Sequence, residues 1–350
     1  MSLGCSPDED HEAWIQKPKA IVDDFSSISL SPAGTHLAAN FMLRGMPNKI
    51  SIVNLSNKEV HVLSGPKEQY LTDISFCPDG NRLIFISTPP NYLGTSLIHS
   101  YDIQTKALGT FGAKDRLYRA PSFAPDGRRI ACFRDMELPG SSYEDIRNRT
   151  VSSYGLHEID VSTGEEKLLD QTCFGGASRT AYGPLGDGIY FSAHHPLVPL
   201  ADNPGIHVRS AWLPDYEEAH AYPRAFFLLF GTPLGERPTP LVSKDVGFFS
   251  SFFGVSSSNE VIIRSNVDNQ RISALILLNG KTRETYDGVE VSGCAISYDS
   301  KTVAISYFVA LNDGAYRKRI RIIDRAGSIL MDASIDDLKH SPSNESALKI

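Results

Sequence analysis

The chain has 350 residues, of which 41% are hydrophobic and 21% are charged, a composition that excludes a disordered, collagen-like or coiled-coil protein. Its 34 lysine and arginine residues are outnumbered by 41 acidic residues, and the net charge of -7 excludes a nucleic acid as the main ligand, because the chain offers no broad positive field. No apolar run approaches the roughly 20 residues of a membrane-spanning helix.

Residues 1–23 are predicted to form an N-terminal extension. This extension either adds a strand to a sheet formed by the rest of the chain, which would close the ring of sheets predicted for residues 24–333, or packs below that sheet. The residues around Cys5, with acidic residues behind them, resemble a bacterial lipoprotein just after its cleavage site, which would make Cys5 a lipid anchor. The same segment lacks the charged and apolar regions of a secretory signal, which favours the cytoplasm. Two locations therefore stay open, the cytoplasm and the periplasm or cell envelope.

From residue 24 onward one pattern recurs: an apolar stretch, a small residue, Pro, Asp or a similar residue, Gly, two polar residues and a second apolar stretch. Because proline fixes φ and glycine accepts a positive φ, each copy predicts a tight turn between two strands. The copies contain Pro32-Ala33-Gly34, Pro78-Asp79-Gly80, Pro125-Asp126-Gly127 and Pro184-Leu185-Gly186, with eroded copies at 255–261 and 296–303.

Each turn is followed by a second pair of apolar stretches, so every repeat predicts four strands. Four-stranded sheets that recur roughly every 40 to 50 residues bury their faces by stacking radially around a channel. The sequence therefore predicts an all-β fold, a six-bladed β-propeller with four antiparallel strands per blade. The predicted blades are 24–70, 71–118, 119–177, 178–249, 250–291 and 292–333, and residues 334–350 are left as a C-terminal tail.

Cys77-Pro78-Asp79-Gly80 and Ala124-Pro125-Asp126-Gly127 resemble the turn of TolB-like propeller repeats, and the resemblance spans about residues 24–333. It implies the fold and leaves the function open, because such repeats also resemble the propellers of prolyl-oligopeptidase-type peptidases and of some polysaccharide lyases. TolB carries an α/β domain before its propeller, for which the residues ahead of the first repeat are too few, so its complete role is not expected here. The sequence contains no Gly-x-Ser-x-Gly elbow of an appended hydrolase.

Two connections between second and third strands are long, at about 134–154 in blade three and 193–224 in blade four. Because the Pro-Asp-Gly turns join first to second strands, these insertions are expected at the opposite end of the propeller. Long loops in a compact repeat usually carry function, so the sequence predicts a ligand site there. The predicted ligand-binding residues are Asp135, Glu137, Tyr143, His194, His195, His207, Arg209 and Trp212.

The blade-four insertion also raises the question of a metal, because it holds His194, His195, His207 and His220 beside several carboxylates. Imidazole and carboxylate suit Zn, Mn or Fe. Gaps of 12 and 13 residues between these histidines define no metal geometry, however. We therefore predict no cofactor and keep a divalent metal as the weaker alternative.

The absence of a catalytic signature favours a non-catalytic module that binds a protein or peptide on the insertion face. The first alternative is an enzyme, a lyase or hydrolase that acts on a carbohydrate or other small substrate through the insertion histidines. The second is a scaffold that uses its blade rims. Replacing residues 197–220 by a short Gly-Ser linker is expected to abolish binding and to leave the fold intact.

Overall fold

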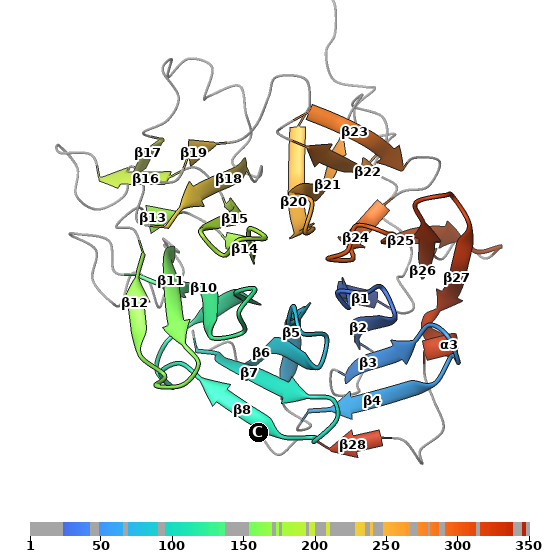
Figure 1. Ribbon diagram of the computed structural model, residues 1–350, viewed down its shortest axis with the longest axis horizontal. Coiled ribbons are helices and arrows are strands. Elements are labelled where there is room, and N and C mark those ends of the chain that lie inside the picture. Colours follow the sequence, from blue (N-terminus) through green and yellow to red (C-terminus); the bar gives the residue numbers. More distant parts are fainter. Residues whose placement is uncertain are drawn as a thin grey trace, which may run out of the picture.

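The computed structural model describes residues 24–42, 49–65, 69–89, 95–136, 154–169, 173–174, 177–193, 196–199, 208–210, 228–234, 239–240, 248–266, 272–278, 281–286, 291–312, 316–338 and 345–347. These residues form six sheets around a central axis (Figure 1). The innermost strand of each sheet contacts that of the next sheet, and the innermost strand of the sixth contacts that of the first. The prediction of an all-β propeller is confirmed.

Four sheets have the same plan, in which the strands pair in chain order as an antiparallel meander. The first contains β1 (Asp24–Leu30), β2 (His36–Met42), β3 (Lys49–Asn54) and β4 (Val60–Ser64). The second contains β5 (Tyr70–Phe76), β6 (Arg82–Thr88), β7 (Leu97–Asp102) and β8 (Leu108–Phe111). The fifth contains β20 (Phe248–Val255), β21 (Glu260–Asn266), β22 (Ile272–Leu278) and β23 (Lys281–Tyr286). The sixth contains β24 (Val291–Ile296), β25 (Thr302–Ala310), β26 (Tyr316–Asp324) and β27 (Ile329–Ser334).

The third sheet is larger than the sequence predicts. Its meander contains β9 (Tyr118–Phe123), β10 (Arg129–Asp135), β11 (Tyr154–Asp160) and β12 (Glu166–Leu168). β12 pairs only with the later part of β11, so Tyr154 at the start of β11 pairs with a further strand, β13 (Cys173–Phe174). Two strands from the blade-four insertion, β16 (Pro196–Pro199) and β17 (Val208–Ser210), continue this sheet beyond β13.

The fourth sheet contains β14 (Ala177–Tyr182), β15 (Gly188–Ala193), β18 (Leu228–Pro233) and β19 (Thr239–Pro240). The long connection of blade four thus follows the end of β15, adds the hairpin β16–β17 to the neighbouring third sheet and returns to its own sheet at β18. Among the described residues this insertion forms no sheet of its own.

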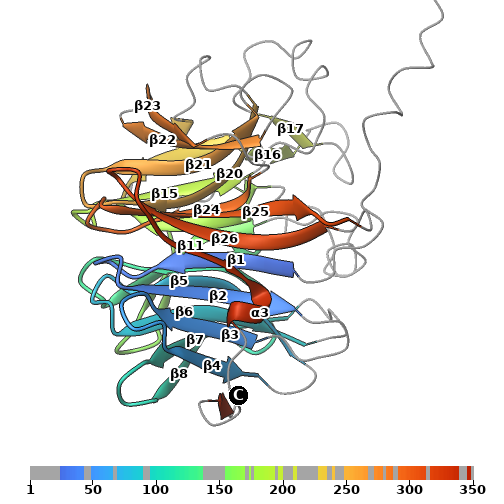
Figure 2. The same ribbon diagram turned by 90° about the vertical axis from the view of Figure 1, so that its right-hand side faces the viewer.

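The predicted C-terminal tail packs against the first sheet. A short helix, α3 (Ile335–Leu338), follows β27 (Figure 2), and β28 (Glu345–Ala347) pairs in parallel with β4 (Figure 1). The Ser51 hydroxyl donates to the Leu338 carbonyl over 3.0 Å, and Leu338 is buried in a cluster with side chains of the first and sixth sheets. The C-terminal segment therefore links the last blade to the first. The strand expected within residues 1–23 lies outside the described residues.

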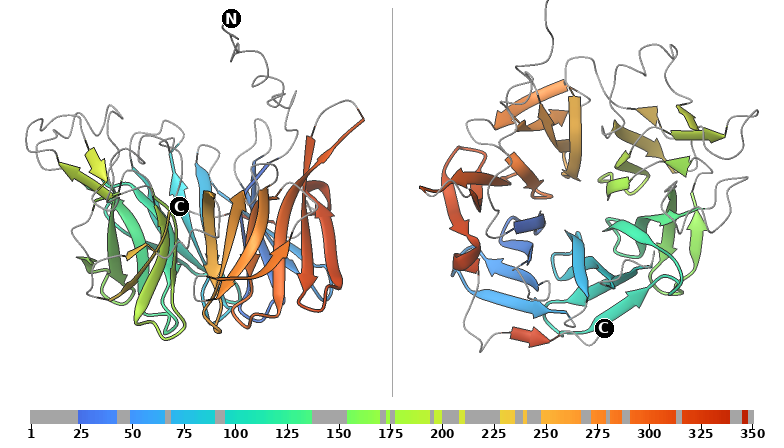
Figure 3. Two further views of the ribbon diagram at one scale, coloured as in Figure 1. Left: turned by 90° about the horizontal axis from the view of Figure 1, so that it is seen from above. Right: turned by 180° about the vertical axis from the view of Figure 1, so that it is seen from behind.

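The turns between first and second strands are equivalent in all six sheets and define one end of the propeller, here called the turn end (Figure 3). In each turn the fourth residue has a positive φ and its N–H donates to the carbonyl three residues earlier over 2.8 to 3.0 Å. Gly80 and Gly127 have the positive φ that the turn motif permits, at 75° and 68°. The other four positions are Gly34, Gly186, Asn259 and Ser300.

Buried apolar side chains lie mainly between neighbouring sheets, so each blade is stabilised by the next. At the turn end, arginines reinforce two of these contacts. Arg82 of the second blade donates to the Gly127 carbonyl of the third and lies 4.7 Å from the Phe123 ring centroid. Arg129 makes the same pair of contacts one blade further on, with the Gly186 carbonyl and the Tyr182 ring. A cation over an aromatic ring adds electrostatic attraction to the packing.

Candidate ligand pocket at the turn end

The described residues enclose a pocket on the propeller axis at the turn end, with about 650 Å³ of empty space that includes space open to solvent. All six innermost strands contribute two equivalent residues each. One set is mostly apolar and consists of Leu30, Phe76, Phe123, Tyr182, Val255 and Ile296. The residues just before these are small and leave the centre open: Ser29, Ser75, Ser122, Ala181, Gly254 and Ala295.

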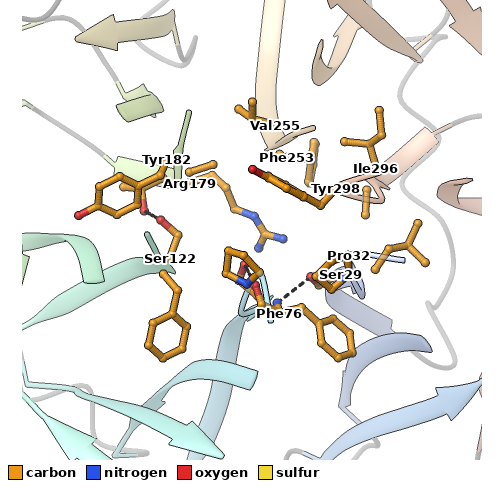
Figure 4. Close-up of a pocket in the computed structure, with 18 of the residues that line it drawn as sticks. Ser29, Pro32, Phe76, Ser122, Arg179, Tyr182, Phe253, Val255, Ile296 and Tyr298 are labelled. Atoms are coloured by element: carbon orange, nitrogen blue, oxygen red, sulfur yellow. Dashed lines mark hydrogen bonds between the residues drawn. The ribbon is translucent and has the colours of Figure 1, made fainter. Parts of the chain in front are cut away.

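Arg179 breaks the sixfold regularity of this central pocket. At the same level of the other innermost strands the residues are Ser27, Asp73, Ala120, Phe252 and Gly293. The Arg179 side chain extends from β14 into the space enclosed by the other blades (Figure 4), and its Nη2 donates to the Ile28 carbonyl of the first sheet over 3.0 Å. Arg179 therefore spans the axis and joins two blades on opposite sides of the ring.

The guanidinium of Arg179 is a buried cation, because the residue is only 8% exposed. Burial lowers its pKa, and the Asp73 carboxylate acts in the opposite direction. An arginine keeps its charge even so. Asp73 is no direct counterion: its Oδ2 accepts the Ala120 N–H over 3.0 Å, and no ion pair found among the described residues includes Arg179.

The hydroxyl groups of the pocket wall are engaged within the protein. Ser29 Oγ accepts the Phe76 N–H over 3.1 Å, the bond drawn in Figure 4. The Ser122 and Thr180 hydroxyls lie 2.8 Å apart, and Thr180 also donates to a backbone carbonyl. A guanidinium carries five N–H donors, of which one is committed to Ile28. Arg179 thus has more spare hydrogen-bond donors than any other side chain that lines this pocket.

A single exposed side chain distinguishes the rim near blade four. Leu185 occupies the turn position that Asp79 and Asp126 hold in blades two and three, and it is 83% exposed, the most exposed large hydrophobic residue of the described chain. The turn that carries it is held by the Tyr298 hydroxyl, which donates to the Pro184 carbonyl. A rigid turn with a leucine at its tip is a suitable anchor for a partner.

Of the eight residues that the sequence predicts to bind a ligand, the structure places Asp135 at the end of β10, outside the lining of the central pocket. It is 8% exposed, its Oδ1 accepts the Leu117 N–H over 3.0 Å, and its own N–H donates to the Leu117 carbonyl. Burial raises the pKa of Asp135. These contacts tie β10 to the start of β9 where the blade-three insertion begins. The backbone of Arg209 lies in β17.

The other six predicted residues lie outside the described residues, and a ligand site among them stays a prediction. They are Glu137, Tyr143, His194, His195, His207 and Trp212. No cluster of three or more His, Cys, Asp or Glu side chains suited to a metal occurs within the described ranges, which do not include the insertion histidines. Likewise, none of the helices described is long and apolar enough to cross a membrane.

Sequence reasoning did not select Arg179 or Leu185. Both deviate from the repeat: Arg179 is a long cation where other blades have a shorter or uncharged side chain, and Leu185 replaces the turn aspartate. Aligning the repeats position by position shows both deviations. The histidine-rich insertion was the stronger signal because its length also departs from the repeat.

Solved structures with the same arrangement are numerous. TolB from Acinetobacter baumannii superposes with a TM-score of 0.55 at 14% sequence identity, over 88% of this chain and 62% of that one. The chain has a TolB-like propeller fold. It spans less than two thirds of that TolB chain. No family model matches its sequence, and no curated protein does so either.

Other neighbours of this TolB-like propeller are enzymes. An oligogalacturonate lyase from Vibrio parahaemolyticus has a TM-score of 0.50 at 11% identity, over 87% of this chain and 76% of the lyase. A prolyl endopeptidase has a TM-score of 0.53 at 11% identity, and this chain spans 49% of its length. At such identities the likeness shows the fold alone, so function has to be argued from the site.

Proposed function

We propose that this TolB-like propeller is a binding protein that takes an extended peptide segment of a partner protein in the central pocket at its turn end. The observation that carries the proposal is the spare hydrogen-bonding capacity of Arg179 in a pocket whose wall also carries a ring of large apolar and aromatic side chains. A few polar groups in an apolar pocket give a ligand its orientation, and the apolar wall gives affinity.

The wall favours a peptide over a carbohydrate. A sugar presents many hydroxyls that need hydrogen-bonding partners, whereas the Ser29, Ser122 and Thr180 hydroxyls each already make at least one hydrogen bond within the protein. Apolar side chains of a peptide suit the ring that contains Phe76 and Phe123. The exposed Leu185 adds an apolar side chain to the turn end of blade four, where a longer segment would leave the pocket.

Binding is also favoured over catalysis by the residue types in the wall. The residues that line the central pocket include no His, Asp, Glu or Cys. The serine and threonine hydroxyls of the wall would need an adjacent general base to act as nucleophiles, and the lining supplies none of the usual ones. Arginine is too basic for that role at neutral pH, and it suits recognition instead.

A peptide-display selection against the wild-type protein tests the proposal. Binders are then measured against Ser75→Trp, which fills the pocket from a half-buried position, and against Leu185→Asp, which makes the rim polar. We expect Ser75→Trp to abolish binding and Leu185→Asp to weaken it about tenfold. Leu330→Asp is the matched control, because Leu330 is also exposed but lies on β27, the outermost strand of its sheet.

Binders that tolerate Ser75→Trp would contradict the proposal. If the same binders were lost when residues 197–220 are replaced by a Gly-Ser linker, the site would lie on the insertion face that the sequence predicts. Melting temperatures of all variants establish that each loss concerns binding and not folding.

A further inference from the structure

We infer that the central pocket recognises a carboxylate group of its peptide ligand, and that Arg179 is the residue that holds it. The inference rests on the proposed function and specifies which chemical group of the ligand Arg179 binds. It concerns a residue that stands at one position of one blade, in a repeat whose other copies have no cation there.

Arg179 is a buried cation whose hydrogen-bond acceptor carries no charge. A buried charge is costly unless a partner offsets the lost hydration. Arg179 has a neutral carbonyl, Ile28 O, as its hydrogen-bond acceptor, and the nearby Asp73 carboxylate accepts a backbone N–H. An entering carboxylate would supply the missing charge, so its binding is favoured more than that of an equally shaped neutral group.

The geometry of the Arg179 guanidinium also suits a carboxylate. Two N–H groups of a guanidinium match the two oxygens of a carboxylate, and such charge-assisted pairs are shorter and stronger than bonds to a neutral carbonyl. A carboxylate therefore competes well with Ile28 O for the Arg179 donors. Because Arg179 precedes Tyr182 on β14, its guanidinium is reached from the turn end past the aromatic side chains.

The pocket wall also limits which molecules can carry that carboxylate. Tyr182, Phe76 and Phe123 line the same pocket as Arg179, so the carboxylate must be carried by a segment with apolar neighbours. A peptide offers such a carboxylate from a Glu or Asp side chain or from its C-terminus. Both sources share the chemistry that Arg179 recognises.

Two matched pairs of short peptides test the inference. The first pair is acetyl-Leu-Phe-Glu-amide and acetyl-Leu-Phe-Gln-amide, which differ only in the side-chain charge. The second is acetyl-Leu-Phe-Ala with a free C-terminus and the same peptide as its amide. We expect the wild-type protein to bind the charged member of at least one pair about tenfold more tightly in calorimetric titrations. The pair that shows the preference identifies the source of the carboxylate.

The variants assign that preference to one residue. Arg179→Gln is expected to bind the charged and neutral peptides equally, and Arg179→Lys to keep part of the preference because an ammonium lacks the planar fork. Arg128→Gln is the matched control, since it removes the same charge from an exposed position at the same end. If Arg179→Gln does not fold, Arg179→Lys serves in its place and must show a smaller preference than the wild type.

Equal binding of charged and neutral peptides by the wild type overturns the inference, as does a preference that survives in a folded Arg179→Gln or is lost in Arg128→Gln. A preference for glucuronate over glucose without any peptide preference would instead assign the pocket to sugar acids. If display-selected peptides still require the pocket but show no carboxylate preference, the proposed function stands and only this inference fails.

Discussion

Two regions of the propeller have turns with the same backbone conformation: the regular blades two and three, and the eroded blades five and six. They differ in the residue type that adopts the positive φ. Gly80 and Gly127 provide the positive φ in the first pair, whereas Asn259 and Ser300 adopt φ of 59° and 63° in the second. An L-residue other than glycine pays a steric cost in this conformation. The repeat is thus preserved as a conformation after its sequence has diverged.

The side chains that connect neighbouring blades also differ between the regular and the eroded blades. Arg82 and Arg129 of blades two and three bind a carbonyl and an aromatic ring of the next blade. Between blades five and six the central group is Glu260, whose carboxylate lies 2.5 Å from Arg283 and 3.0 Å from Arg325. Glu260 is only 1% exposed. The eroded blades therefore depend on a buried charge where the regular blades use packing and partly exposed ion pairs.

The largest effect is expected from Glu260→Gln. Removing the buried carboxylate takes away the partner of Arg283 and leaves Arg325 with Glu284 alone, and we expect a loss of about 3 kcal/mol in the free energy of unfolding. Denaturant unfolding measures it. Asp126→Asn is the control in blade three, where the Asp126 side chain is 44% exposed and a loss below about 1 kcal/mol is expected. Equal losses in the two variants would remove the distinction between the blade pairs.

The effect of Glu260→Gln should depend on pH. Hydrogen bonds from Arg325 and the nearby arginine charges, which outweigh burial, lower the pKa of Glu260 below its ordinary value of 4.5. A carboxyl with a lowered pKa contributes stability that is present above 4.5 and is lost as the pH falls through its pKa in the folded state. The difference between wild type and variant should therefore be constant above about pH 5 and should narrow in more acidic solution.

An intermediate effect is expected at the turn glycines, where Gly80→Ala and Gly127→Ala differ in what the new Cβ would meet. At Gly80 the nearest atom is Pro32 Cδ at 3.5 Å, whereas at Gly127 it is Arg82 Nη2 at 2.5 Å. Both substitutions incur the cost of a positive φ, about 1 kcal/mol. Gly127→Ala also displaces Arg82, which raises its expected loss to about 2 kcal/mol. Similar melting temperatures of the two variants would show that the Arg82 contact contributes little.

The fold could be predicted because proline fixes φ and glycine accepts a positive φ, so the turn motif predicts the local backbone conformation directly. The predicted second blade, 71–118, for example, begins within one residue of β5. Residues 345–347 gave no such signal, because their strand forms only by pairing with β4. The pairing of β16 with β13 is likewise a tertiary contact that no local pattern encodes.

The central pocket was harder to predict for a different reason. Its lining residues come one or a few from each blade, and most of them read as ordinary strand residues, such as Phe123 and Ile296. Only their convergence on the axis makes a site. Arg179 was visible in the sequence as a deviation within the repeat, but its significance depends on Ile28 lying across the ring.

The smallest effect is expected where a turn residue is replaced by glycine. Ser300→Gly removes the steric cost of a positive φ, roughly 1 to 2 kcal/mol, and adds about 0.5 to 1 kcal/mol of unfolded-state entropy, so a net stabilisation of about 0.5 kcal/mol is expected. Asn259→Gly should not stabilise, because Asn259 Oδ1 accepts a hydrogen bond from Tyr190 over 2.8 Å and asparagine tolerates this conformation. Thermal unfolding of the two variants tests the difference. A stabilisation by Asn259→Gly equal to that by Ser300→Gly would mean that backbone strain alone governs the eroded turns and that the bond to Tyr190 contributes nothing.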